Sequence, residues 1–292
     1  MLGSVCGVSN LEAVIKANYL CDELGIDTIS TGNIIGFVME CYEKGIIGKD
    51  DLDGIEAKWG SEEALIALIE KIGLAEGVGK LLAEGVKKLA EKWNKGAEKF
   101  AMHAKGLEQS AYDTRSAPSM ALAYATADVG AHHNRAWTIY KDITMGEKWT
   151  LEDRVDIVIF HQHVRPMFDA LGVCRLPWIE LEIPLEFYAK AYTAATGIET
   201  TIDELLKRSE GIYNITRAIN VRRGIRRKDD YPPDRVFEDP VLKGSRRGNK
   251  LSREEYEKLL DLYYEKRGWN KEGVPTEEKL RELGLDFIIG KI

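Results

Sequence analysis

Apolar residues recur with helical spacing along most of the chain, whereas runs of Val, Ile and Thr with strict alternation are nearly absent. In residues 9–25, Ser9 or Asn10 is suited to cap a helix, apolar residues follow at i, i+3 and i+4, and Gly25 can end it. The same pattern predicts helices over residues 28–45, 61–77, 78–94, 252–269 and 276–284. Three of them open with a Ser or Thr followed by acidic residues, which predicts caps at Ser61, Ser252 and Thr276. The helix over residues 28–45 is expected to be more buried than the first and to open at residues 31–33. We therefore predict a mainly α protein with few strands.

Two less helical stretches suggest how the chain is divided. Residues 103–118 are expected to be a seam between two helical lobes, which predicts helical domains over residues 1–102 and 103–292. Residues 229–249 hold three of the eight prolines and are expected to form a surface arm before the last helices.

The composition is that of an ordinary globular protein. The 292 residues are 44% hydrophobic and 30% charged, and no stretch approaches the roughly 20 uninterrupted apolar residues that span a bilayer. The first ten residues lack a basic leader and an apolar signal core, so we expect a cytoplasmic protein. Gln occurs only at positions 109 and 162 while Lys and Glu abound, which resembles the composition of proteins from thermophiles.

The net charge of −7 argues against a protein whose main task is to bind nucleic acid. One basic run stands out, and because acidic residues and prolines follow it, we favour a solvated face or a domain contact over a phosphate site. Its members are Arg222, Arg223, Arg226, Arg227 and Lys228. Residues 73–80, "GLAEGVGK", superficially resemble a phosphate-binding loop. They lack the preceding strand and the Lys-Ser/Thr ending of a P-loop, so we do not expect them to bind phosphate.

Two short strings are nearly alike: "DELGID" at residues 22–27 and "DALGVC" at residues 169–174. A helix often stops at Leu-Gly because glycine adopts the left-handed turn at little steric cost. A third string, "RELGLD" at residues 281–286, has the same stop but begins with Arg281. Leu-Gly alone is therefore a helix end, and the leading Asp and the closing Asp or Cys are the distinctive part.

The four cysteines, at positions 6, 21, 41 and 174, form no Cys-x-x-Cys pair. This excludes a disulfide scaffold and a self-contained zinc or iron–sulfur site. Cys174 follows a helix stop and precedes Arg175 and Pro177, so it is expected in a turn where its sulfur faces a cavity. The alternative is that it is a small buried hydrophobic residue.

Histidines occur in two notable stretches. In residues 123–137, "AYATADVGAHHNRAW", His132, His133 and Arg135 follow a glycine and offer an imidazole and a guanidinium for an oxyanion, although one histidine of such a pair is often structural. His161 and His163 have the spacing of some metal sites, but no third ligand accompanies them, so we favour packing.

Five stretches resemble, in the same order, the C-terminal half of the tungsten-containing aldehyde:ferredoxin oxidoreductase family. They are residues 1–33, 105–115, 125–137, 168–174 and 263–286. The resemblance covers nearly the whole chain, and the paired Asp-x-x-Gly-aliphatic-Asp/Cys motifs are its most specific part. It implies two intertwined helical domains, the first carrying one pterin motif and the second carrying the other motif and a cluster cysteine.

The resemblance also implies roles for particular residues. In that family the two motifs bind two pterins that hold one tungsten (tungstopterin), and carboxylates suit the N–H donors of a pterin edge. The implied cofactor-binding residues are Asp22, Ile26 and Asp27 for one pterin, Asp169 and Val173 for the other, and Arg135 and Arg175 beside the cofactor. Cys174 would be the fourth thiolate ligand of a [4Fe–4S] cluster. His133 would stand near the tungsten as the catalytic proton donor or acceptor.

The family reaction oxidises an aldehyde with water to a carboxylic acid and sends two electrons to ferredoxin. The implied partners are ferredoxin, a small aldehyde, a second copy of the chain and the family's N-terminal pterin-binding domain with its three-Cys run. Because that domain is absent here, the chain alone is expected to be inactive and to hold neither cofactor firmly. Val129 and Thr114 stand where the family usually has Arg and Pro. The alternative is a truncated or diverged helical domain that binds no metal and acts as an interaction module.

Overall fold

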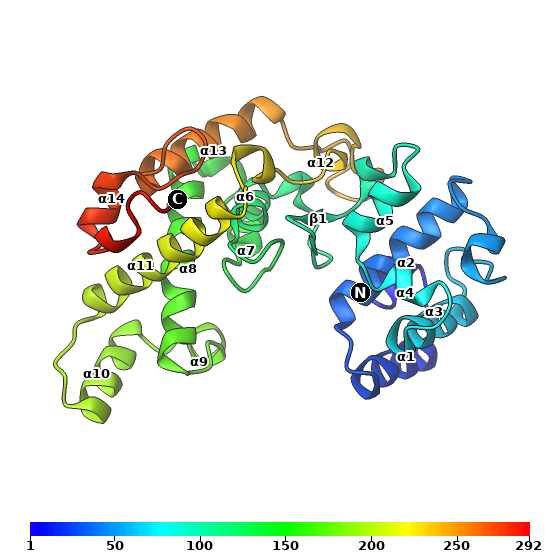
Figure 1. Ribbon diagram of the computed structural model, residues 1–292, viewed down its shortest axis with the longest axis horizontal. Coiled ribbons are helices and arrows are strands. Elements are labelled where there is room, and N and C mark those ends of the chain that lie inside the picture. Colours follow the sequence, from blue (N-terminus) through cyan, green and yellow to red (C-terminus); the bar gives the residue numbers. More distant parts are fainter. The chain divides into compact units, whose positions relative to one another are not determined.

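The computed structural model of the protein describes residues 1–292, apart from the side chain of Glu147. Its regular structure consists of fourteen α-helices, several short 3-10 helices and one two-stranded antiparallel sheet among the described residues (Figure 1). The prediction of a mainly α fold with few strands is confirmed. No helix in this described part is long and apolar enough to cross a membrane.

The chain folds into two compact units that interleave along the sequence. The first comprises Met1–Ser116, Val129–His133 and Tyr231–Leu251, and the second comprises Ala117–Asp128, Asn134–Asp230 and Ser252–Ile292. The first crossing, after Ser116, falls inside the seam predicted over residues 103–118. The first unit continues past residue 102, and the domain limits 1–102 and 103–292 stay a prediction.

The first unit is built around one buried helix. Its elements are α1 (Leu11–Glu23), α2 (Thr28–Glu43), α3 (Glu62–Leu74), α4 (Gly79–Leu82), α5 (Val86–Trp93), β1 (His103–Ala104), β2 (Leu107–Glu108) and α12 (Arg235–Glu238). Helix α2 lies in the core, where Ile35, Val38 and Met39 are fully buried. Gly32 allows the first residues of the chain to approach this helix, because a Cβ there would lie 2.7 Å from Met1 Cβ.

Helix ends in this unit follow from their capping residues. Asn10 and Ser61 accept backbone N–H groups at the starts of α1 and α3, as predicted. The expected start of the second helix at residues 31–33 was wrong: α2 begins at Thr28 because Asp27 caps it. The helix pattern over residues 78–94 is broken into α4 and α5, since Gly85 adopts a φ of +85° between them.

The second unit packs two long helices against each other. Its elements are α6 (Pro118–Thr126), α7 (Ile139–Met145), α8 (Leu151–Leu171), α9 (Leu176–Glu180), α10 (Leu185–Thr196), α11 (Ile202–Arg222), α13 (Arg253–Arg267) and α14 (Glu277–Glu282). Helix α8 runs beside α11 and also contacts α6 and α13 (Figure 1). The predicted caps Ser252 and Thr276 open α13 and α14.

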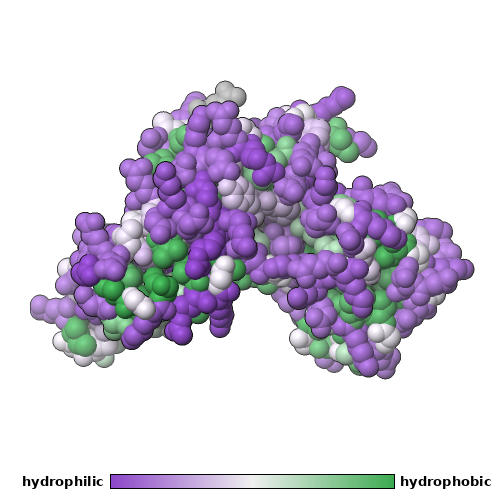
Figure 2. Space-filling view, turned by 45° about the horizontal axis from the view of Figure 1, so that its top comes forward, coloured by the Kyte–Doolittle hydropathy of each residue, from purple (hydrophilic) through white to green (hydrophobic). Residues whose placement is uncertain are grey.

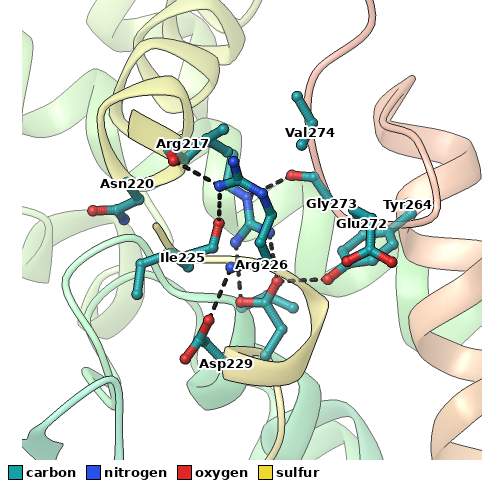
Figure 3. Close-up of polar contacts among 12 residues, drawn as sticks. Arg217, Asn220, Ile225, Arg226, Asp229, Tyr264, Glu272, Gly273 and Val274 are labelled. Carbon is teal, nitrogen blue, oxygen red and sulfur yellow. Dashed lines mark hydrogen bonds and ion pairs between the residues drawn. The ribbon is translucent and has the colours of Figure 1, made fainter. Parts of the chain in front are cut away.

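A buried ionic network ties α11, the turn after it and α13 together in this unit (Figure 3). The Arg217 guanidinium donates to Asp230 at 3.0 Å and to the Gly273 carbonyl at 2.7 Å, and the Tyr264 hydroxyl donates to Asp230 at 2.6 Å. Gly273 cannot be replaced without a clash, because a Cβ there would lie 2.2 Å from the guanidinium. In the nearby basic run Arg222, Arg223 and Lys228 are exposed, whereas Arg226 and Arg227 are half-buried and bind other parts of the unit.

Candidate functional site

The three Leu-Gly strings adopt the same backbone turn. Their glycines have left-handed φ angles of +66° at Gly25, +67° at Gly172 and +68° at Gly284. In each turn the next N–H reaches back five residues: Ile26 to the Cys21 carbonyl (2.9 Å), Val173 to Phe168 (3.1 Å) and Leu285 to Leu280 (2.8 Å). The prediction that Leu-Gly ends a helix is confirmed. The turns therefore differ only in the side chains that they carry.

The first turn carries two exposed carboxylates. Asp22, on the last turn of α1, accepts a hydrogen bond from Asn18 Nδ2 at 3.2 Å. Asp27 accepts the Ser30 N–H at 2.7 Å through Oδ2, which caps α2. Ile26, between them, is half-buried against the core. Both carboxylates keep at least one oxygen that no described residue binds.

The second turn carries an aspartate that is already paired with a predicted site residue. The Arg135 guanidinium donates to Asp169 at 2.5 Å and to Asp128 at 2.8 Å. Asp169 is 68% exposed, whereas Asp128 is 5% exposed. Although burial opposes the charge of Arg135, these two carboxylates raise its pKa. The structure therefore brings Arg135 and Asp169 together, with Asp128 as the buried anchor.

His133 lies in the first unit beside aromatic neighbours. Its ring stacks on that of His132 with centroids 5.4 Å apart and meets the Tyr112 ring edge-on at 6.0 Å. Tyr112 lines a cavity of about 270 Å³, whose wall also includes the rings of Phe37 and Trp59. The wall is mainly apolar and partly aromatic, and it also includes the charged side chains of Glu40, Asp113 and Arg115. Such a cavity near an imidazole suits a small organic ligand. The sequence did not predict this cavity.

Cys174 differs from the other three cysteines. Cys6, Cys21 and Cys41 are buried, and burial raises the pKa of all three thiols, to about 12 for Cys6 and Cys41. Cys174 is exposed and unbridged at the end of the second turn. No three His, Cys, Asp or Glu side chains gather in metal-binding geometry within the described residues. Cys174 would thus be a single ligand to a metal group held mainly by other chain segments.

The surroundings of Cys174 fit an anionic group. Arg165 Nε, Arg175 Nε and the Tyr188 hydroxyl are buried and have no hydrogen-bond partner among the described residues. Buried donors without acceptors are rare and costly, so they indicate a missing acceptor. A thiolate-ligated iron–sulfur cluster supplies such negative charge.

His161 and His163 have protein partners. His161 Nδ1 accepts the Trp137 N–H at 3.2 Å, and His163 Nε2 lies 2.7 Å from the Arg267 guanidinium. Burial, reinforced by nearby cations, lowers the pKa of both rings to about 3. Both imidazoles are therefore neutral parts of the packing around α8.

Comparison with known proteins decides the family. Residues 1–285 match the family described as "Aldehyde ferredoxin oxidoreductase, domains 2 & 3". The chain belongs to the aldehyde ferredoxin oxidoreductase family. The tungsten-containing aldehyde ferredoxin oxidoreductase of Pyrococcus furiosus is 36% identical in an alignment 292 positions long, which covers 97% of this chain and 47% of that protein. The corresponding protein of Thermococcus kodakarensis is 35% identical over the same shares.

Two further proteins are similar to this chain over nearly its whole length. The aliphatic sulfonate oxidoreductase, WOR-like subunit, of Pyrococcus furiosus is 32% identical over 97% of this chain and 44% of its own length. The solved complex BamBC of benzoyl coenzyme A reductase with 1,5-dienoyl-CoA superposes with a TM-score of 0.78 at 27% identity, covering 96% of this chain and 47% of the matched chain. The chain thus spans about half the length of the relatives that it matches. These matches give no support to the alternative of a metal-free interaction module.

The predicted site residues are divided between the two units. Asp22, Ile26, Asp27 and His133 lie in the first unit, and Arg135, Asp169, Val173, Cys174 and Arg175 lie in the second. Their roles remain predictions. Three residues of the candidate site were not among those predicted from the sequence: Arg165, Asp128 and Tyr188. The four-residue spacing of Arg165 and Asp169 on one helix was the available signal for the first of these.

Proposed function

We propose that this chain is the C-terminal part of a tungsten-bispterin, iron–sulfur oxidoreductase that oxidises aldehydes to carboxylic acids with ferredoxin as electron acceptor. One observation carries the proposal: Cys174 is an exposed thiol on a turn that repeats the turn of Asp22, and its neighbour Arg175 carries a buried Nε without an acceptor. The names of the relatives, tungsten-containing and ferredoxin-linked, support the same assignment.

In this proposal the two turns bind the two pterins. Asp22 and Asp27 would accept N–H groups of one pterin edge through their exposed oxygens, with Ile26 against its face. Asp169 would accept N–H groups of the second pterin, with Val173 against the face of that pterin. Arg135 would hold Asp169 in place and contact that cofactor, while Asp128 keeps the guanidinium charged and oriented.

The bound tungsten–pterin group would supply the acceptor for the two electrons of the aldehyde carbon, and the cluster would relay them to ferredoxin. His133 would take up the proton that is released when water adds to the carbonyl carbon, because imidazole ionises near neutral pH. The mainly apolar cavity beside Tyr112 would hold the hydrocarbon part of the aldehyde and exclude water from it.

The proposal requires a segment or subunit that supplies the remaining three cluster thiolates and the other side of the pterin site. The test is tungsten and iron analysis of this chain purified alone and purified with such a partner. We expect tungsten and four irons per complex and neither metal in the chain alone. A complex free of tungsten would refute the proposal. A Cys174→Ala complex that keeps an unchanged cluster would refute the role of that thiol.

A further inference from the structure

The buried hydrogen-bond donors of the second unit that have no acceptor among the described residues include one on α8, one on α10 and one on the residue after Cys174. These three are Arg165 Nε, the Tyr188 hydroxyl and Arg175 Nε. Arg165 is 3% exposed and Tyr188 is 7% exposed, so water does not satisfy these side chains as it does a surface residue.

Two other buried arginines of the same unit have hydrogen-bond acceptors within it. Arg217 is paired with Asp230 and the Gly273 carbonyl. Arg267 donates to Gln162 at 2.5 Å and lies 4.4 Å from the centre of the Tyr213 ring. Arg165 has only a ring contact, 5.5 Å from the centre of Trp178, and no hydrogen bond to any described residue. Arg267 therefore leaves only its Nε without an acceptor, whereas Arg165 has no hydrogen-bond acceptor at all among the described residues.

These donors belong to the immediate surroundings of Cys174. Arg175 is its neighbour in sequence, and Arg165 lies one helical turn before Asp169 on α8. The Phe168 carbonyl accepts the Val173 N–H at 3.1 Å, and the Phe168 ring contacts the Tyr188 ring with centroids 4.9 Å apart. Burial, followed by the nearby Cys174 thiol, raises the pKa of the Tyr188 hydroxyl.

The charges in this region do not balance. Burial, followed by repulsion from Arg175, lowers the pKa of Arg165 to about 10. Asp169 is the acid that raises the pKa of Arg165, but its carboxylate already accepts a hydrogen bond from the Arg135 guanidinium at 2.5 Å. A buried cation without an acid is costly unless an anion meets it.

We propose that Arg165, Arg175 and Tyr188 form a donor shell for the metal-bound sulfur of Cys174 and for the negative charge of the iron–sulfur cluster. The inference rests on the proposed function, which makes Cys174 a cluster ligand. Hydrogen bonds to the sulfurs and nearby positive charge stabilise the more negative, reduced state of a cluster and raise its reduction potential. The three side chains are thus positioning residues that set the potential at which electrons leave for ferredoxin.

The test is an EPR-monitored redox titration of the cluster in the complex with the partner that supplies the other thiolates. We expect Arg165→Gln and Tyr188→Phe to shift the reduction potential to more negative values, and Arg165→Lys, which keeps the charge, to shift it less. Arg222→Gln, at an exposed arginine of the same unit, is the matched control and should leave the potential unchanged. Circular dichroism melting of each variant checks its fold.

An unchanged potential in cluster-loaded Arg165→Gln and Tyr188→Phe complexes would overturn the inference and leave the proposed function intact. If Arg165→Gln fails to fold, an unchanged potential in Tyr188→Phe alone overturns it. A wild-type complex without a cluster would overturn the proposed function first, and the donor shell with it.

Discussion

At the scale of single residues, the exposure of Cys174 is directly measurable with a thiol reagent. Burial keeps Cys6 and Cys41 protonated at pH 8, because it raises the pKa of each to about 12. We expect one fast-reacting thiol per folded chain in a titration with DTNB, and none in Cys174→Ser. Cys41→Ser should keep the fast-reacting thiol. Two or more fast thiols in the folded wild-type chain would contradict the assignment.

Thr114, which stands where the family usually has Pro, carries a buried hydroxyl without a partner among the described residues. Thr114→Val should therefore raise the free energy of unfolding, by about 1 kcal/mol, since it removes an unsatisfied group. Thr126 is the matched control, because its hydroxyl donates to the Leu122 carbonyl at 2.7 Å and accepts from Gln162. Thr126→Val should lower the stability in urea denaturation. A loss of stability in Thr114→Val would show that its hydroxyl is bound.

The structural role of a residue could be predicted from the sequence only where its interactions are local. The glycine stops at Gly25 and Gly172 depend on a few neighbouring residues and were predicted correctly. The start of α2 is also set locally, by the Asp27 cap, but it was expected at residues 31–33. The spacing of Arg165 and Asp169 is visible in the sequence, but the lack of an acceptor for Arg165 Nε depends on which side chains folding brings near, so it could not be predicted.

At the scale of elements, the pair between Arg217 of α11 and Asp230 connects α11 to α13 through Tyr264. Asp230→Asn should lower the free energy of unfolding by about 3–5 kcal/mol, because it leaves a buried guanidinium uncompensated. Glu254→Gln, which removes an exposed pair with Lys258, should have no measurable effect in the same urea denaturation. Equal stability of both variants would contradict a structural role for the network.

The two histidines of α8 predict a dependence of stability on pH. Their pKa of about 3 in the folded state lies below the ordinary value of about 6.5 in the unfolded chain. The neutral rings therefore contribute full stability above pH 6.5, and this contribution is lost as the pH falls toward 3, because the unfolded chain binds the protons first. His163→Gln should give a shallower fall of the free energy of unfolding between pH 7 and 5. An unchanged slope would contradict the burial of this ring.

Most helices could be predicted because their caps and apolar spacing are local. Ser61, Ser252 and Thr276 open helices as expected. The break at Gly85 was missed, since the apolar spacing continues across it and only the positive φ of the glycine separates α4 from α5.

At the scale of the whole molecule, the sequence pattern did not predict which segments of the chain form each of the two units. Residues 231–251 belong to the first unit, where the Arg235 guanidinium pairs with Glu40 of α2 and Val236 is buried. Such long-range contacts leave no periodic signal. The face drawn in Figure 2 is largely hydrophilic, with hydrophobic areas between the polar ones. Exposed apolar side chains such as Leu11 and Leu181 contribute to the apolar part of the surface.

The central claim is that the turns of Asp22 and Asp169 serve one shared cofactor with Cys174 on its cluster. The most direct test is a crystal structure of the complex with its partner, with anomalous scattering measured at the tungsten and iron absorption edges. The account predicts a tungsten peak flanked by both turns, pterin N–H groups on Asp22 and Asp169, and an iron bound to Cys174 Sγ. A tungsten peak away from either turn, or a Cys174 sulfur without iron beside it, would contradict the account.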